Sequence, residues 1–249
     1  MDNSQNIFEI LKEIVFFDNL TDPQLKKISK AFTKETFLMG DQISVGDQEL
    51  DHIRILINGE VREIVEHPEL KKILTLNIEK PISLIGLNSS SGKNPCELIS
   101  AATDCVFLKI KVKQWESILS KFPDILIHVN EKVRPSNIWE IIRRRTDIGI
   151  PEKSKDLKRW IRILTEKACS ITVSKDKNII KNLDSSKEWF LASVLDRFDS
   201  GTIINNEILN LIISHDKSIR IIGLPKKLFL KSVEDELEES SFIKSKEVS

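Results

Sequence analysis

Several features are scarce or missing in this sequence, and each absence narrows the class of protein. The 38 basic and 38 acidic residues cancel, so the chain of 249 residues has no formal net charge. A chain without net charge lacks the whole-molecule attraction that a nucleic-acid or anionic-membrane binder exploits. Any such binding would have to be local, and we do not expect nucleic acid as a partner.

Cysteine and long apolar runs are also scarce. The three cysteines are Cys96, Cys105 and Cys169, and none forms the close pair of a zinc knuckle or a redox motif. This usage is typical of a reducing cytoplasm. Charged residues interrupt the apolar residues of the first segment, and no stretch approaches the roughly 20 apolar residues of a membrane helix. We expect a cytoplasmic chain without a membrane span.

Catalytic and metal-binding patterns are missing as well. The four histidines lie far apart, and none has an acidic or cysteine neighbour at metal-ligand spacing, which predicts surface positions for His52, His67, His128 and His215. No nucleophile–base pair, P-loop or acidic metal cluster can be assembled from the sequence. We therefore expect no enzyme, no metal and no catalytic residues.

What the chain does contain is two short helices, a β-rich block and a further helical region. Apolar residues recur at helical spacing from Ile7 to Val15, and a second helix opens at Thr21, where a capping residue precedes Pro23. From about residue 35 to 110, short apolar runs alternate with glycines, which predicts strands and turns. The helical period returns at Trp115 and continues to about residue 145, with a break at proline 123.

Four ordered segments carry a resemblance to a known family: VFFDNLTDPQLKKISKAF, FLMGDQISVGD, IRILINGEVREI and ATDCVFLKIKVKQWESILSKFP. At these spacings the first 130 residues or so resemble the cyclic-nucleotide-binding domain family. The resemblance implies an α+β fold, in which a β-roll (a double-stranded β-helix or jelly roll) is flanked by helices. Gly40, Gly46 and Gly59 then fall at turns, where a positive φ costs glycine little.

A narrower similarity concerns the regulatory region of cyanobacterial peptidase-containing ABC exporters. Pro95-Cys96-Glu97 followed by two alanines, then Thr103-Asp104-Cys105 and a Trp-containing helix, are similar to that region. It implies a protein partner or downstream transporter domains for export of peptides or bacteriocins.

The ligand segment of the family departs from its pattern in this chain. In the family, a glycine–glutamate pair and an arginine hold the ribose and the cyclic phosphate. Here Gly86 matches the glycine, Leu87 stands where the glutamate belongs, and no arginine occurs between Arg62 and Arg134. Because a hydrogen bond to a charged group contributes roughly 1.5–3 kcal/mol, two such losses weaken binding by about 100-fold or more.

We therefore expect no cyclic nucleotide as cofactor. Two interpretations of the segment stay open: it is a polar surface loop in a domain kept for protein contacts, or it presents hydroxyl groups, amides and one ammonium to another small anion. The candidate pocket residues are Gly86, Leu87, Asn88, Ser89, Ser90, Ser91 and Lys93.

The second half is less regular but shows a weak self-similarity at an offset of about 136 residues. KDLKRWIRILTEKACSITVSKDKNI echoes PQLKKISKAFTKETFLMGDQI, and EWFLASV falls where HIRILIN did. This indicates a degenerate second β-roll; the alternative is a helix pair with a few strands. The predicted division is a roll domain at 1–135, a connector and second roll at 136–231, and an acidic or polar tail at 232–249.

Two functions from different classes fit these patterns. The first is a non-catalytic regulatory or interaction module with a degenerate ligand pocket, attached to or working with an exporter. The alternative is a transcription regulator of the catabolite-activator type, which needs a winged helix-turn-helix that the sequence does not show. Self-association into a homodimer stays open. The arginine run 143–145 either meets acidic groups of a partner or is a solvated helix end.

Overall fold

The computed structural model describes residues 3–46, 51–85, 98–145, 148–173, 183–192, 195–215 and 219–226. The chain forms two compact units. Unit 1 consists of residues 1–65 and 77–130, and unit 2 of residues 66–76 and 131–249. These units are defined by packing, whereas a domain is a part of the chain that could fold alone. The domain division predicted from the sequence therefore stays a prediction.

Unit 1 opens with helix α1 (Asn3–Lys12), the 3₁₀ turn η1 (Val15–Phe17) and helix α2 (Asp22–Ser29). The start of α2 is the predicted one. The backbone N–H of Thr21 donates to Gln24 Oε1 over 2.8 Å, which closes a capping box around the first turn. Proline in this turn costs nothing, because the first amides of a helix have no intrahelical acceptor.

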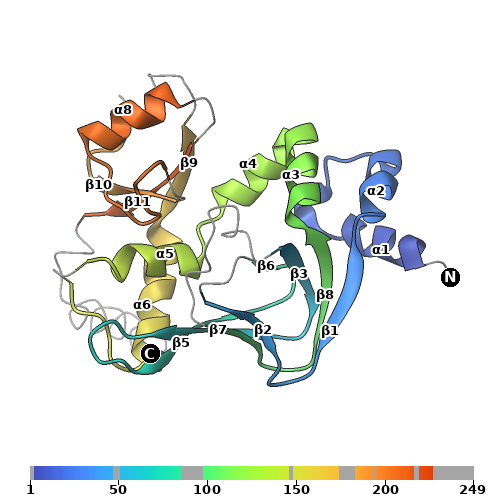
Figure 1. Cartoon of the computed structure of the whole chain (residues 1–249), viewed down its shortest axis with the longest axis horizontal. Helices are drawn as coiled ribbons and strands as arrows, with labels where there is room; N and C mark the ends of the chain where they lie inside the picture. Colours follow the sequence, from blue (N-terminus) through green and yellow to red (C-terminus); the bar gives the residue numbers. More distant parts are fainter. Residues whose placement is uncertain are drawn as a thin grey trace, which may run out of the picture. The chain divides into compact units, whose positions relative to one another are not determined.

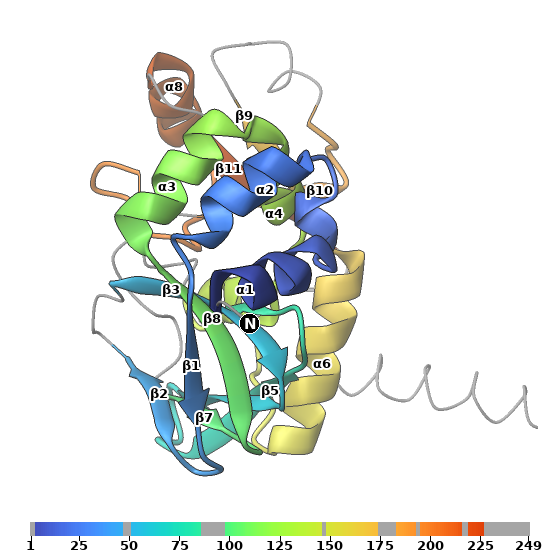
Figure 2. The same cartoon turned by 90° about the vertical axis from the view of Figure 1, so that its right-hand side faces the viewer.

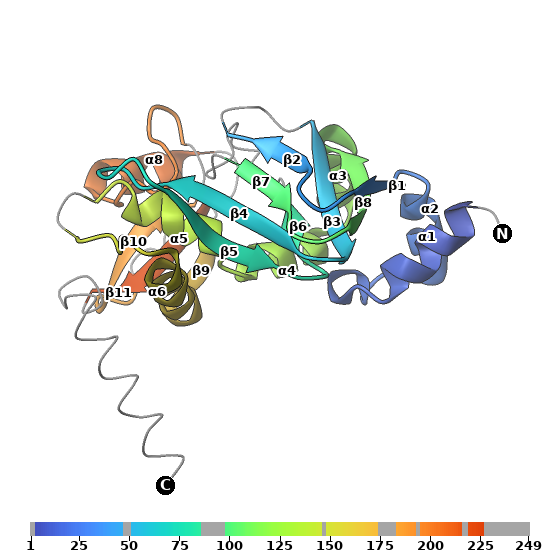
Figure 3. The same cartoon turned by 90° about the horizontal axis from the view of Figure 1, so that it is seen from below.

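The described residues that follow form eight strands: β1 (Thr33–Phe37), β2 (Gln42–Val45), β3 (His52–Asn58), β4 (Val61–Glu66), β5 (Ile73–Glu79), β6 (Leu84–Ile85), β7 (Leu98–Ala101) and β8 (Cys105–Lys111). They form two four-stranded sheets with the orders β1-β8-β3-β6 and β2-β7-β4-β5 (Figures 1 and 3). First and last strands pair, and the chain passes repeatedly from one sheet to the other, as in a jelly roll. The fold is therefore α+β, with the predicted β-roll flanked by helices.

Two glycines sit where the sequence places the turns of the roll. Gly40, between β1 and β2, and Gly59, between β3 and β4, have φ values of 95° and 92°. These lie in the left-handed region, which glycine adopts without steric cost. At both points the chain crosses from one sheet of the roll to the other, because β1 and β3 lie in one sheet and β2 and β4 in the other.

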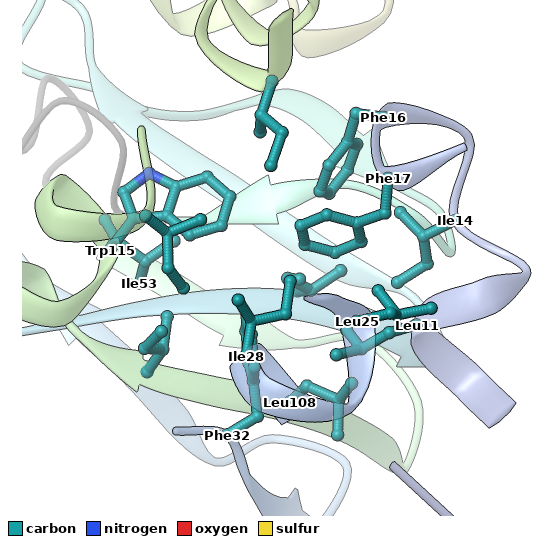
Figure 4. Close-up of a cluster of buried hydrophobic side chains, with 14 of the residues drawn as sticks. Leu11, Ile14, Phe16, Phe17, Leu25, Ile28, Phe32, Ile53, Leu108 and Trp115 are labelled. Carbon is teal, nitrogen blue, oxygen red and sulfur yellow. The ribbon is translucent and has the colours of Figure 1, made fainter. Parts of the chain in front are cut away.

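Helices α3 (Val112–Lys121) and α4 (Pro123–Glu131) continue directly from β8, with the predicted break at Pro123. The aromatic rings of Phe16 and Phe17 meet the Trp115 ring edge-on, with centroids 6.3 and 6.4 Å apart (Figure 4). The same cluster takes up Ile53 and Leu108 from the sheet, so the helices cover one face of β3 and β8 (Figures 2 and 4). Burial of this apolar area holds helices and sheet together.

Unit 2 contains helices α5 (Pro135–Ile142), α6 (Ser154–Lys167) and α8 (Asn206–Ser214), and strands β9 (Cys169–Val173), β10 (Lys187–Leu191) and β11 (Ile219–Pro225). The strands form one antiparallel sheet in the order β10-β11-β9. Trp139, Trp160 and Trp189 are buried in this unit, at 0%, 5% and 8% exposure. Helix α5 is buried on all sides, since every residue from Ser136 to Ile142 is buried.

The sheet of unit 2 repeats the pairing of three strands of the roll. In unit 1, β8 lies between β1 and β3; in unit 2, β11 lies between β9 and β10. The registers correspond pair by pair. The pairing of β1 with β8 corresponds to that of β9 with β11: the pairs Thr33–Lys109 and Phe37–Cys105 match Cys169–Gly223 and Val173–Ile219. The pairing of β3 with β8 corresponds to that of β10 with β11: the pairs His52–Lys111 and Leu56–Phe107 match Lys187–Pro225 and Leu191–Ile221.

This correspondence supports the internal repeat inferred from the sequence. Thr33 and Cys169 are 136 residues apart, the predicted offset, while the match of β3 to β10 differs by one residue from the one predicted. Among the residues that the structure describes, unit 2 contains one sheet of a roll and no second one. Helix α8 packs on the sheet instead.

One hairpin that joins two strands of the roll is itself a part of unit 2. The turn between β4 and β5 contributes residues 66–76 to that unit. His67 is 1% exposed, which corrects the surface position predicted for it. Its Nδ1 accepts the backbone N–H groups of Glu69 and Leu70, so Nε2 carries the proton and donates to the carbonyl of Ile150 over 3.1 Å.

None of the helices in the described parts of the chain combines the length and apolar character needed to cross a bilayer.

Candidate functional site

The candidate pocket residues predicted from the sequence lie outside the described residues. These are Gly86, Leu87, Asn88, Ser89, Ser90, Ser91 and Lys93. The structure describes the two ends of their segment: Ile85 ends β6 in one sheet, and Leu98 begins β7 in the other. The predictions made for the segment itself stay predictions, and the site is built here from the strands beside it.

The interior face of the sheet β1-β8-β3-β6 is identified by alternation along the strands. Ile53, Ile55 and Leu108 lie in the core cluster shared with the helices. Side chains that alternate with them therefore project from the opposite face, away from those helices. Leu56 and Phe107 lie on this opposite face, are directly paired and are fully buried, which makes it the inner surface of the roll.

Three charged side chains stand on that inner face. Glu35 accepts from Arg54 Nε through Oε2 and from Lys109 Nζ through Oε1, each over 2.7 Å. The three side chains are 20%, 12% and 31% exposed. One carboxylate thus joins cations from two neighbouring strands, β3 and β8, and we refer to Glu35, Arg54 and Lys109 as the charged triad.

The surroundings of Glu35 favour its ionised form. Partial burial of the carboxyl opposes ionisation, but the hydrogen bonds and charges of Arg54 and Lys109 outweigh it, so the pKa of Glu35 lies below its ordinary value. At neutral pH the carboxylate is charged and neutralises part of the positive charge on this face.

Aromatic rings hold the triad in place. The Arg54 guanidinium lies over the ring of Phe37, 5.9 Å from its centroid, and Phe37 meets Phe107 edge-on at 5.6 Å. Arg54 is directly paired with Ile85, the last residue before segment 86–97. Arg54 of the triad is therefore the neighbour of the residue after which the predicted ligand segment begins.

The second sheet contributes a further acidic side chain. Glu63 in β4 is 5% exposed and is paired with Ile99, while its neighbour Val61 is paired with Ala101. These side chains share one buried face of the sheet. Two carboxylates, Glu35 and Glu63, thus stand on buried faces of the roll.

Unit 2 has apolar residues at the positions of the triad. By the strand correspondence, Ile171, Trp189 and Gly223 match Glu35, Arg54 and Lys109. Ile171 and Trp189 belong to an apolar cluster that Ile208 and Ile212 of α8 complete. In unit 2, then, the face that corresponds to the inner face of the roll is filled by the chain's own helix.

The arginine run is engaged inside the chain. Arg143 and Arg144 contact Glu140 at 2.5 and 3.6 Å, Arg144 also contacts Asp199 at 3.3 Å, and Arg145 pairs with Glu188. Neither sequence interpretation described this role, in which the run ties the end of α5 to β10 and to the loop at Asp199.

Cys105 is a buried residue at the start of β8. It is 1% exposed, and its thiol donates to the carbonyls of Glu60 and Thr103. Burial raises the pKa of the Cys105 thiol, which keeps it in the unreactive protonated form. Cys96 lies outside the described residues. Among those described, no group of three or more His, Cys, Asp or Glu is placed to hold a metal ion.

The sequence reasoning missed the triad, although a signal for it was present. Arg54 stands between two isoleucines in a segment recognised as a strand, and Lys109 stands likewise between Leu108 and Ile110. A charged residue in the middle of a strand with two buried faces is unusual, because burying a lone charge is costly. Such positions mark candidates for paired charges.

No family model matches the sequence, and none of the curated proteins matches it. Solved structures of cyclic-nucleotide-binding domains do resemble it. One is the regulatory subunit of a cAMP-independent protein kinase A from Trypanosoma cruzi, bound to guanosine (TM-score 0.48, 16% identity, 55% of this chain and 49% of that one). The chain thus spans about half the length of this relative.

Two bacterial structures also resemble the chain. They are a cyclic nucleotide-binding domain from Methylobacillus flagellatus (TM-score 0.41, 18% identity, 51% of this chain and 71% of that one) and the catabolite activator protein of Thermus thermophilus (TM-score 0.40, 17% identity, 46% and 54%). Because these TM-scores are below 0.5, the assignment of the roll rests on the strand order of the chain itself.

Proposed function

We propose that this chain is a non-catalytic regulatory or interaction module of the cyclic-nucleotide-binding type, whose roll does not take a cyclic nucleotide in the manner of that family. The observation that supports this most is the charged triad. Arg54 and Lys109, the cations at the centre of the described inner face, both bind Glu35. A cyclic phosphate would have to compete with a carboxylate already in place.

The sequence adds a second reason. Leu87 replaces the glutamate, and no arginine is available in segment 86–97. With both charged contacts of the family missing and the nearest described cations occupied, the roll is better suited to contacts with a protein partner. A peptide-exporting ABC transporter remains the partner predicted from the sequence. As before, nucleic acid is not expected, and a membrane would be reached through that partner.

The transcription-regulator alternative gains no support from the arginine run. Arg143 and Arg144 contact Glu140, and Arg145 pairs with Glu188, so this run does not form a free basic surface for phosphates. We therefore rank DNA binding second.

A thermal-shift titration tests the proposal, because a ligand that binds only the folded state must raise the melting temperature. The whole chain would be titrated with cyclic AMP, cyclic GMP and cyclic dinucleotides. We expect no shift at micromolar ligand. A clear shift with cyclic AMP or cyclic GMP would make the chain a nucleotide sensor and would overturn the proposal.

A further inference from the structure

The charged triad is not required by the fold, and the chain itself provides the comparison. Unit 2 builds the same three strands, with the same registers, on Ile171, Trp189 and Gly223. Placing an ion pair inside a protein is often no more stabilising than placing apolar side chains there, because both charges must be desolvated. A reason other than stability is needed for the three charges in unit 1.

The two cations are arranged as an anion site. Arg54 is held over Phe37, and Arg54 and Lys109 are directly paired across β3 and β8. Both point their nitrogens at one carboxylate, each over 2.7 Å. Arginine with a second cation is a common way to bind phosphate and carboxylate oxygens, because charge-assisted hydrogen bonds are short and strong.

The position of Glu35 in its sheet favours its displacement by a ligand. Glu35 lies on β1, an edge strand of its sheet, between the exposed residues Lys34 and Thr36. Its side chain is 20% exposed, so it is already in partial contact with solvent. A change of its side-chain torsions is the movement that displacement requires. Arg54 and Lys109 belong to inner strands and keep their places.

We propose that Arg54 and Lys109 form a binding site for the oxyanion of a small ligand, a phosphate monoester or inorganic phosphate, which displaces Glu35. The proposal rests on the proposed function in one respect, since it specifies the ligand class of the same roll. A phosphate monoester carries a charge of about −1.5 to −2 at neutral pH. It therefore has an advantage over the single charge of Glu35, which a singly charged cyclic phosphodiester lacks.

Calorimetric titration of the whole chain in a phosphate-free buffer tests the site with four probes: inorganic phosphate, AMP, cyclic AMP and adenosine. Wild type is expected to bind phosphate and AMP weakly, and cyclic AMP and adenosine not at all. The substitution Glu35→Gln removes the competing charge and keeps the shape of the side chain. It should tighten phosphate and AMP binding about 10-fold or more.

Two control variants show whether a change in affinity comes from the proposed site. Glu116→Gln removes a carboxylate from the exposed side of α3 and should leave every affinity unchanged. Adding Arg54→Met to Glu35→Gln should abolish the gain, with circular dichroism showing that the variant is folded. Phosphate binding that does not tighten in Glu35→Gln, or that persists in the double variant, overturns the site. Binding of cyclic AMP to wild type as tight as that of AMP contradicts the proposed function instead.

Discussion

At the scale of single residues, Gly59 and Gly40 share a left-handed backbone and differ in their surroundings. A Cβ on Gly59 would lie 2.3 Å from the carbonyl oxygen of Asp104, whereas one on Gly40 would meet nothing within 4 Å. Gly59→Ala should therefore lower the free energy of unfolding by about 3 kcal/mol, because backbone strain and the clash add up. Gly40→Ala should lower it by about 1 kcal/mol, from backbone strain alone.

Urea unfolding of both variants checks this difference. Equal losses at the two positions would mean that the turn at Gly59 can move away from the loop at Asp104 without cost.

At Ile82 the strain is already present in the native chain, because a β-branched residue has a φ of 72° there. Its side chain is 49% exposed, so a replacement gives up little burial. Ile82→Asn should raise the free energy of unfolding by about 1 kcal/mol, since asparagine tolerates this conformation better. Ile73→Asn, at a 64% exposed position in β5, is the control and should bring no gain. Chemical unfolding curves of both variants decide, and a less stable Ile82→Asn would contradict the idea.

Glu140 gives the chain a pH dependence of definite sign. Burial raises the pKa of its carboxyl above the ordinary value, although Arg143 and Arg144 lie beside it. Between the ordinary and the raised pKa the folded chain binds more protons than the unfolded chain. Stability should therefore fall as pH rises through this window.

Glu140→Gln has no such group to titrate. Urea unfolding at a series of pH values from 4.5, the ordinary pKa of the carboxyl, upward should show the free energy of unfolding falling in wild type. In the variant this free energy should depend less on pH. A wild-type stability that rises through the window would mean that the arginines control the pKa of Glu140.

At the scale of elements, the pairing of β10 with β11 depends on a residue without a side chain. A Cβ on Gly223 would lie 2.9 Å from the ring of Trp189, which is paired with it across the two strands. An aromatic ring over a strand glycine covers backbone that the glycine leaves bare. Gly223→Ala should cost about 2 kcal/mol, because Trp189 must leave its position.

The loss of stability caused by Gly223→Ala should be smaller in a Trp189→Leu background, because the smaller side chain leaves room for the methyl group. A double-mutant cycle measured by thermal unfolding gives the coupling. Additive losses would place the cost in β11 itself and not in the contact with Trp189.

At the scale of the whole molecule, hairpin 66–76 makes the two units discontinuous in sequence. Leu74 and Leu76 are 5% and 1% exposed, the backbone N–H of Thr75 donates to Ser154 Oγ, and His67 donates to Ile150. A fragment of residues 1–135 keeps the hairpin and lacks the part of unit 2 that contains Ile150 and Ser154.

We expect this fragment to be cut by trypsin at Lys71 or Lys72 much faster than the whole chain, because proteases act at locally unfolded segments. Limited proteolysis followed by mass spectrometry locates the first cut. Equal resistance of fragment and whole chain would show that the hairpin folds without unit 2.

Much of the roll was readable from local chemistry. Thr21 and Gln24 mark a helix start, Gly40 and Gly59 mark turns, and Pro123 separates two helices; each depends on neighbours close in sequence. Partners distant in sequence were not readable. Glu35 and Lys109 are 74 residues apart, and His67 and Ile150 are 83 residues apart. No local pattern states which strands pair across such separations.

In the first half of the chain, the sequence by itself determined the order of helices and strands and the turns, because periodicity, capping and glycine act within a few residues. Tertiary structure alone decided which charges meet inside the roll, which helix fills the corresponding face of unit 2, and where the hairpin 66–76 packs. These outcomes depend on strand register, which brings side chains together only after the sheets have formed.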